Sequence, residues 1–271
     1  MLKIVEKKKI WFTISILIIV IGFGFMFTKG MNFGIDFRGG TQVVINMGTD
    51  FNKTDVDKIV DEYSKDAVTN QVNGTELQIK AKELNSSQVN DIFKALKEKY
   101  DLKDDALVSQ NEIGASVGRD LTTNAIVALV IAVIGMLIYV VIRFEFSFGI
   151  AAIIALLHDV LITISVYAVF GITINPPFIS AILTIVGYSI NDTIVIFDRI
   201  RENRKKLRGK SVEEIADMSI TQTMSRSINT TLTTLITIVC VYIFVPTVRD
   251  FAFPLIVGIA SGACSSIFIA S

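Results

Sequence analysis

Long apolar stretches, separated by short polar segments, dominate the sequence. A helix needs about 17 to 25 mainly apolar residues to cross a bilayer, and six stretches of the chain are long enough. They are Ile10–Phe27, Ala125–Ile142, Phe148–Phe170, Phe178–Phe197, Ile228–Val245 and Phe251–Ala270. The pattern therefore predicts a polytopic α-helical membrane protein with six transmembrane helices.

The first apolar stretch follows several lysines, as the apolar region of a signal peptide does. It is longer than the apolar region of most signal peptides, and the following "TKGMNFG" has no small-residue cleavage site. We interpret residues 1–28 as a short N-terminal segment and an uncleaved first span.

Residues 29–124 are the one large polar segment, and they have the pattern of a small α+β domain. "TQVVINM" and Glu76–Ala81 alternate as strands do, Ala67–Asn73 is a weaker strand candidate, and "ALVSQNEIGA" is a last strand. "DVDKIVDEYSKDA" and "SSQVNDIFKALKEKY" have helical spacing, with Ser86 or Ser87 expected to cap the second helix. The order predicts a ferredoxin-like βαββαβ domain.

Positive charge predicts the orientation, although the formal net charge is zero. Lys and Arg mark cytoplasmic loops, and alternation through six spans places the basic clusters on one side. They are the N-terminus, Arg143 and the run Arg199, Arg201, Arg204, Lys205, Lys206, Arg208 and Lys210. Both termini are therefore expected in the cytoplasm, and the polar domain is expected outside.

The last five spans are expected to form one bundle over residues 125–271, with a basic cytoplasmic connector at 199–227. Ser211 and Glu214 have the spacing of a capping box, which predicts a helix that starts there. We expect this connector helix to lie along the inner membrane surface.

Composition excludes several classes of protein. The chain has 271 residues, of which 51% are hydrophobic and 19% charged, too few charges for a soluble domain. Two cysteines, both within apolar stretches, exclude a disulfide framework. The single histidine makes a metal site improbable. We expect no cofactor, with protons as the coupling ion.

Four ionisable residues fall within or next to the predicted spans: His158, Asp159, Asp192 and Arg226. Such groups cost roughly 2.5 to 3.5 kcal/mol at membrane depth and usually face the bundle interior or a water path. Residues three and four apart share a helix face, so polar stripes on three spans should pack together. They are Asp159 with Thr163 and His158 with Ser165 on the third span, Tyr188, Ser189 and Asp192 on the fourth, and Arg226, Thr230, Thr233 and Thr237 on the fifth.

Asp192 is the strongest functional candidate. Dry surroundings keep an isolated acid neutral, and a nearby arginine such as Arg226 favours its ionised form. These opposing effects suit a group that gains and loses a proton, so we interpret Asp192 as part of a proton relay. The alternative, in which such polar groups only hold the helices together by hydrogen bonds, stays open, above all for the threonines.

"MNFGIDFRGGTQ" lies where the first span gives way to the polar domain. Its glycine pair, Gly39 and Gly40, predicts a tight bend or bulge at this joint. No lysine followed by serine or threonine comes after it, so the motif does not predict a phosphate site.

Four motifs together resemble the SecF family, the smaller of the paired accessory subunits of the bacterial Sec protein-export machinery. They are "FGIDFRGGT", "ALLHDVLIT", "VGYSINDTIVIFDRIREN" and "SRSINTTLTT", in an order and topology that cover nearly the whole chain. The chain departs from the family at Arg38, where a small polar residue is common. It also ends at "SSIFIAS", within the sixth span, without the short basic tail expected of the family.

The resemblance implies half of an RND-type transporter in the bacterial cytoplasmic membrane, with a ferredoxin-like extracytoplasmic head. It implies a SecD-like partner, the SecYEG channel and a translocating unfolded polypeptide, with the proton gradient promoting export. Asp192 and Arg226 match the family's proton-pathway residues, and Gly34, Asp36, Gly39 and Gly40 match its glycine motif. Further candidates for the proton pathway are Asp159, His158, Tyr188, Ser189, Asn191, Thr230 and Thr233.

Three other functions remain open from the sequence. One is half of an RND-type proton-driven exporter of lipids or small molecules. A second is an intramembrane aspartyl protease built on Asp159 and Asp192, although "LHDV" and "SIND" differ from the motifs of such enzymes. The third is an assembly scaffold that uses no protons. We expect a proton-driven translocase subunit without covalent catalysis.

Overall fold

A computed structural model describes residues 4–72, 74–82, 84–207 and 209–270. Lys3, Asn73 and Arg208, on which parts of the predictions rest, lie outside the described residues. The chain divides into two compact units, which we call the helical unit (Met1–Asn32 and Ile126–Ser271) and the head unit (Phe33–Ala125).

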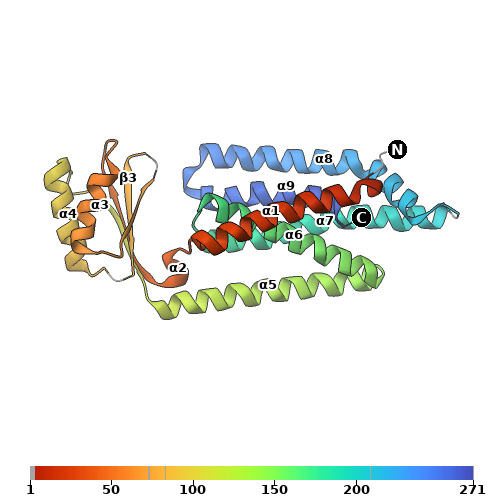
Figure 1. Ribbon diagram of the computed structural model, residues 1–271, viewed down its shortest axis with the longest axis horizontal. Helices are drawn as coiled ribbons and strands as arrows, with labels where there is room; N and C mark the ends of the chain where they lie inside the picture. The colour runs from red at the N-terminus through yellow and green to blue at the C-terminus, as the bar shows by residue number, and fades with distance from the viewer. Residues whose placement is uncertain (1–3, 73, 83, 208, 271) are drawn as a thin grey trace. The chain divides into compact units, whose positions relative to one another are not determined.

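Six helices in the described residues are long and apolar enough to cross a membrane, and each contains most of one predicted span. Figure 1 shows them as a bundle of long, roughly antiparallel or parallel helices. They are α1 (Lys8–Lys29), α5 (Ala115–Arg143), α6 (Phe146–Phe170), α7 (Pro176–Lys206), α8 (Val212–Phe244) and α9 (Arg249–Phe268). Two short 3₁₀ helices, η1 (Val5–Lys7) and η2 (Pro246–Val248), precede α1 and α9. The polytopic helical architecture is thus confirmed.

The connector differs from its prediction. Among the described residues of the connector, 199–207 and 209–227, no separate helix lies between the fourth and fifth spans, because the segment that begins at Ser211 is the start of α8 itself. Ser211 and Glu214 do form the predicted capping box, each backbone amide bonded to the other side chain at 3.2 Å. Neither glycine nor proline interrupts the sequence from Val212 to Phe244, so nothing ends the helix before the span begins.

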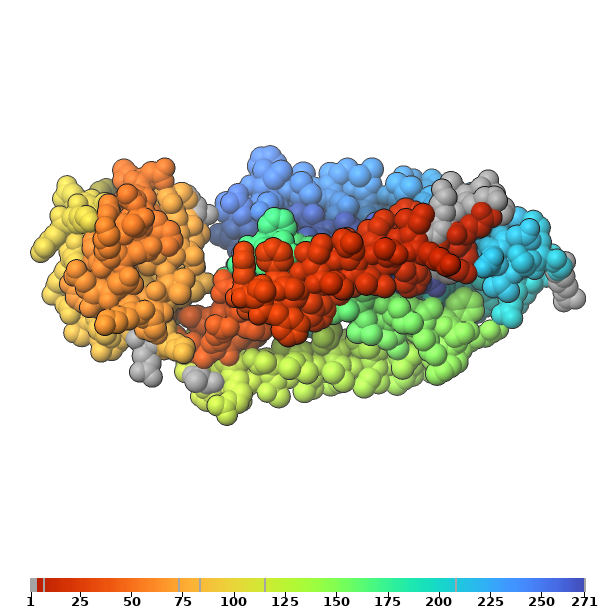
Figure 2. All heavy atoms as spheres, viewed as in Figure 1, coloured from red at the N-terminus to blue at the C-terminus, as the bar shows by residue number. Residues whose placement is uncertain are grey.

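Three of the six helices form the interior of the helical unit. α6, α7 and α9 have many buried residues, whereas α1, α5 and α8 are mostly exposed, and Figure 2 shows α1 on the surface of this unit. Glycines allow the closest approaches: a Cβ at Gly258 of α9 would lie 2.2 Å from Cδ1 of Ile185 on α7. Small residues at such contacts are typical of membrane helix packing.

The head unit has the predicted β-α-β-β-α-β order of elements. They are β1 (Gly40–Asn46), α3 (Lys53–Tyr63), β2 (Val68–Val72), β3 (Glu76–Ala81), α4 (Ser86–Tyr100) and β4 (Leu107–Ile113). The sheet is antiparallel in the order β2-β3-β1-β4, and Figure 1 shows α3 and α4 on the same side of it. Val43 and Leu77 of the sheet and Val60 and Leu96 of the helices belong to one buried core.

The cap of α4 was predicted one or two residues too late. Asn85, rather than Ser86 or Ser87, accepts a hydrogen bond from the Gln88 amide at 2.8 Å, and the Gln88 side chain accepts one from the Asn85 amide. Asparagine caps helices as well as serine does, so composition alone does not distinguish these neighbours.

The glycine motif forms the bend that the sequence predicts. Gly34 precedes a single helical turn, α2 (Ile35–Arg38), whose first turn contains Asp36. Gly39 then ends α2 with φ +75°, and Gly40 begins β1 with φ +133°. A Cβ at Gly40 would lie 2.5 Å from the carbonyl oxygen of Ala81 on the neighbouring strand. Both the dihedral angle and the close approach therefore require glycine.

We expect Gly258→Ala to destabilise the helical unit by about 1–3 kcal/mol, because its methyl group overlaps Ile185 and forces α7 and α9 apart. Thermal unfolding in detergent, followed by circular dichroism, measures the change. Gly135→Ala on α5 is the matched control, because, apart from the nearby backbone of its own helix, no heavy atom of the described residues lies within 4 Å of its added Cβ. Equal stability of the two variants would contradict this packing.

The head unit should lose one stabilising contribution in acid. Hydrogen bonds from the Ser64 hydroxyl (2.8 Å) and the Lys82 amide (3.0 Å) lower the pKa of Asp66 below its ordinary value. A lowered pKa gives stability that is present above the unfolded-state value and is lost as the pH falls through the folded-state value. We expect hydrogen exchange at the Lys82 amide to accelerate over that acid range beyond the intrinsic pH effect. Asp66→Asn should abolish this additional dependence, and its persistence in the variant would refute the assignment.

Candidate functional site

Asp192 is buried between α7 and α8, with 9% of its surface exposed. Its Oδ1 accepts a hydrogen bond from the Ser227 hydroxyl of α8 at 2.7 Å. Its Oδ2 is also buried, and no described residue donates a hydrogen bond to it. Burying a charged carboxylate oxygen without a hydrogen-bond donor costs free energy. A protonated carboxyl group has a neutral hydroxyl at this position, which costs less to bury. The geometry thus leaves one oxygen of Asp192 able to bind a proton.

Arg226 is the residue before Ser227 on α8, and its side chain is exposed. It interacts with the charge of Asp192 through space, but the two side chains form no ion pair among the described residues. The sequence predicted that they could approach each other. They lie on neighbouring helices, and no hydrogen bond or ion pair joins the two side chains among the described residues.

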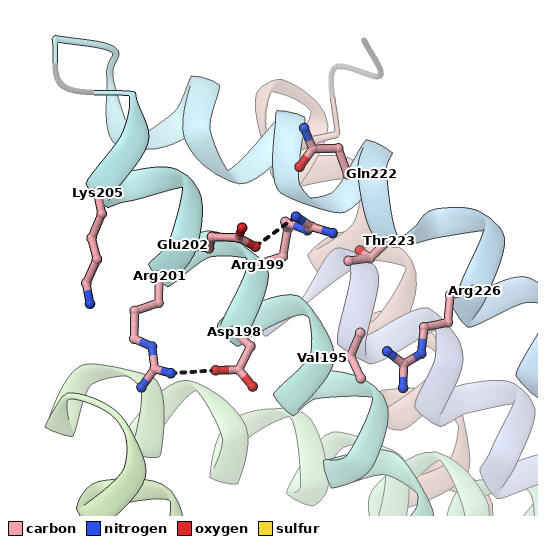
Figure 3. Close-up of a pocket in the computed structure, with 9 residues that line it drawn as sticks. All are labelled: Val195, Asp198, Arg199, Arg201, Glu202, Lys205, Gln222, Thr223 and Arg226. Carbon is pink, nitrogen blue, oxygen red and sulfur yellow. Dashed lines mark hydrogen bonds and ion pairs between the residues drawn. The ribbon is translucent and has the colours of Figure 1, made fainter.

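Arg226 also lines a cavity of about 570 Å³ between α7 and α8. Figure 3 shows Arg226 and Val195 on the facing helices, with the ion pairs of α7 beyond them. Two of these pairs have 2.8 Å contacts, Arg199 with Glu202 and Arg201 with Asp198. Val195 lies three residues after Asp192, so this charged cavity ends about one helical turn from the Asp192 carboxyl. Water in the cavity would provide a medium for protons near the acid.

Asp159 on α6 has very different surroundings, because it is fully buried and both of its oxygens are paired. Its Oδ1 contacts His158 Nδ1 at 3.0 Å and accepts from the Ser261 hydroxyl at 2.8 Å. Its Oδ2 accepts from the hydroxyls of Ser189 at 2.6 Å and Ser265 at 2.8 Å. Three helices, α6, α7 and α9, thus supply partners to one carboxyl group.

The two acids are adjacent parts of one polar region. Ser189, which binds Asp159, lies three residues before Asp192 on the same face of α7. The Thr193 hydroxyl pairs with Ser266 of α9 at 2.8 Å, which extends the polar contacts between these helices. The structure therefore brings together His158, Asp159, Ser189 and Asp192.

The remaining candidates lie outside this cluster. The Tyr188 hydroxyl donates to Thr234 of α8 at 3.2 Å. Thr230 and Thr233 are exposed, and their hydroxyls bond to carbonyl groups of their own helix. Asn191 is exposed on α7.

Sequence reasoning missed the serines that bind the two acids: Ser227, Ser261 and Ser265. Two of them belong to "SGACSS" in the last apolar stretch. A concentration of small polar residues in a membrane span is the signal that could have identified them.

Known protein families match this chain over most of its length. The family described as "Protein export membrane protein SecD/SecF, C-terminal" matches residues 92–271, and the family "SecD/SecF GG Motif" matches residues 24–51. The chain belongs to the SecD/SecF family. The range matched by the GG-motif family includes the bend at Gly39 and Gly40.

Curated members of the SecD/SecF family are similar over nearly the whole chain. "Protein translocase subunit SecF" of Petrotoga mobilis is 36% identical, over 98% of this chain and 93% of the relative. The protein of the same name from Sebaldella termitidis is 39% identical, over 100% of this chain and 90% of the relative.

A crystal structure has been solved for SecDF of Thermus thermophilus, a protein similar to this chain. Its crystal structure, described as that of a translocon-associated membrane protein, has a TM-score of 0.89 and 34% identity to 98% of this chain. This chain spans 37% of that SecDF chain. A SecDF crystal structure described as a super-membrane-facing form has a TM-score of 0.71, with 33% identity over 98% of this chain.

The hydrogen bonds predict that the two acids differ in their effect on stability. We expect Asp159→Ala to lower the free energy of unfolding by about 3 kcal/mol, because three serine hydroxyls lose a buried acceptor. Asp192→Ala should cost about 1 kcal/mol, since one hydroxyl loses its partner. Parallel unfolding curves of the purified variants in detergent measure both. A larger loss for Asp192→Ala would contradict the roles assigned to the two sites.

Proposed function

We propose that this chain is a SecF-type subunit that acts with a SecD-like partner in Sec protein export and uses the proton gradient to promote polypeptide translocation. The observation that carries the proton step is Asp192, a buried acid with one oxygen bonded to Ser227 and the other unpaired among the described residues. The names of relatives that align over nearly the full chain support the export role.

Protonation of Asp192 would change the interaction between α7 and α8. The ionised carboxylate attracts Arg226 and accepts from Ser227, whereas the neutral acid attracts Arg226 only weakly. The charged cavity beyond Val195 would exchange protons with the cytoplasm. One charge that crosses 100 mV is worth about 2.3 kcal/mol, which biases a two-state element roughly fiftyfold. We propose that this bias is used to shift the head unit between two conformations.

The SecD-like partner is proposed to cover an exposed polar face of the membrane helices. Ser180, Thr184, Gly187 and Asn191 are exposed and recur on one face of α7. Small and polar residues such as these pack poorly against lipid tails and well against another helix. SecDF of Thermus thermophilus, of which this chain spans 37%, supports a second half of similar kind. The SecYEG channel and the translocating polypeptide are the further proposed partners, with no cofactor besides protons.

The proposed topology has both termini in the cytoplasm and the head unit outside. Arg143 at the end of α5 and Arg204 at the end of α7 lie at the helix ends that this assignment places in the cytoplasm. We assign the head unit to the ferredoxin-like fold, because it combines the βαββαβ order with the strand order β2-β3-β1-β4. The helical unit corresponds to half of an RND-type transporter.

The alternative functions receive less support. A protease dyad needs two carboxyl groups that share a proton, whereas Asp159 and Asp192 bind separate sets of described partners. Relatives named protein translocase subunits favour polypeptide export over export of lipids or small molecules. A scaffold that uses no protons would not require an acid with an unpaired oxygen at membrane depth.

The decisive variant is Asp192→Asn, which keeps the size of the side chain and removes its titration. We expect membrane vesicles with this variant to export a secreted precursor at a rate that no longer responds to the proton gradient. Asp250→Asn on α9 is the control, because it removes an acid that bonds to Asn175 outside the Asp192 site. Gradient-dependent export that survives in Asp192→Asn would refute the proposed function.

A further inference from the structure

We propose that Ser15, His158 and Asp159 form a coupling link, a set of positioning residues that connects the proton site to α1. The proposal rests on the function proposed above and assigns these residues a role other than proton transfer. Asp159 lacks an unpaired oxygen, since each of its two oxygens already has two polar contacts. We call its carboxyl group the Asp159 anchor. Its partners lie on α6, α7 and α9, so a movement of any of these helices changes its hydrogen bonds.

His158 bridges two helices through its two ring nitrogens. Nδ1 lies 3.0 Å from Asp159 Oδ1, and Nε2 lies 2.9 Å from the Ser15 hydroxyl of α1. With a proton on Nδ1, the neutral ring donates to the Asp159 carboxyl and accepts from the Ser15 hydroxyl at Nε2, so one tautomer satisfies both contacts. The ring therefore connects α1 to the Asp159 anchor in a defined orientation.

Ser15 is the main polar attachment of α1 within the apolar stretch. Among the described residues 10–27, it is the one whose side chain has a hydrogen bond to another helix, while the Thr13 hydroxyl bonds to the carbonyl of Lys9 on α1 itself. A second contact follows seven residues later on each helix, where a Cβ at Gly22 would lie 2.2 Å from Cβ of Ser165. Contacts spaced seven residues apart on both helices fix the register of two parallel helices.

Ser189 connects this link to the proton site. Its hydroxyl donates to Asp159 Oδ2 at 2.6 Å, and it lies on the same face of α7 as Asp192. A shift of α7 that follows proton exchange at Asp192 would move Ser189 relative to Asp159. Because the carboxyl of Asp159 is saturated, the change must be taken up by its other contacts, including the one to His158.

The link ends on the helix that continues into the head unit. α1 ends at Lys29, and the head unit begins at Phe33, four residues later in the chain. Much of α1 is exposed on the surface of the helical unit (Figure 2). Its other side packs along α6, and Trp11 stacks on Phe268 of α9, so Ser15 and Gly22 are the points at which the link would act on this helix. A change in the hydrogen bonds of His158 would therefore reach the head unit through α1.

The test uses the complex with its SecD-like partner, reconstituted in proteoliposomes with the channel, and measures precursor export and proton permeation separately. Ser15→Ala removes the hydroxyl, and His158→Asn can retain a donor near Nδ1 but does not reach Ser15. We expect gradient-driven export to fall about two- to tenfold in each variant, the effect of one lost hydrogen bond. Proton permeation should stay at the wild-type rate. The double variant should be no worse than either single variant, because both break the same contact.

Two variants on the same helix serve as controls. Thr13→Ala removes a hydroxyl that bonds only within α1, and Ser15→Thr keeps the hydroxyl at position 15, so both should export as the wild type does. Unchanged export in Ser15→Ala and His158→Asn would overturn the proposal. A parallel loss of permeation and export would also overturn it, since that result indicates a proton relay.

The result for Asp192→Asn distinguishes failure of this link from failure of the proposed function. Loss of gradient dependence in Asp192→Asn together with normal export in the other two variants rejects only the link. Retention of gradient dependence in Asp192→Asn rejects the proposed function as well.

Discussion

Polar groups at membrane depth must find partners within the protein, and the carboxyl group of Asp159 is where this constraint acts most strongly. It has four polar contacts, three of them with serine hydroxyls of α7 and α9. Since hydrocarbon offers no replacement donors, these contacts join α6, α7 and α9 through one carboxyl group, and a shift of any of the three helices changes them. In addition, Gly258 and Gly262 of α9 allow α7 to approach closely.

Asp192 lies only three residues beyond Ser189, yet its carboxyl group is incompletely paired, in contrast to that of Asp159. Both oxygens of Asp159 already have two polar contacts each, whereas Asp192 has a single hydrogen-bond donor among the described residues and one oxygen left for a proton. We propose that the helical unit divides two tasks between two acids on neighbouring helices. In this proposal Asp159 links the helices, and Asp192, beside Arg226 and the charged cavity, exchanges protons.

Local patterns predicted the elements well, because hydrophobic periodicity depends on near neighbours in the chain. The six spans, the β-α-β-β-α-β order and the capping box at Ser211 all follow from such patterns. The hydrogen-bond partners of the acids could not be predicted in this way. Ser261 and Ser265 lie more than a hundred residues after Asp159, and serine is common in membrane helices. The prediction of a connector helix along the membrane surface was wrong about where that helix ends. The polar segment after Ser211 continues directly into the fifth span, because no glycine or proline ends the helix between them.

Infrared difference spectroscopy of the complex in lipid, with isotopically labelled aspartate, tests the central claim most directly. We expect acidification to produce the carbonyl stretching band of a protonated aspartic acid in a dry environment, and we expect this band to be absent from Asp192→Asn but present in Ser15→Ala. If the same band persisted in Asp192→Asn, another acid would carry the proton, which would contradict the role proposed for Asp192.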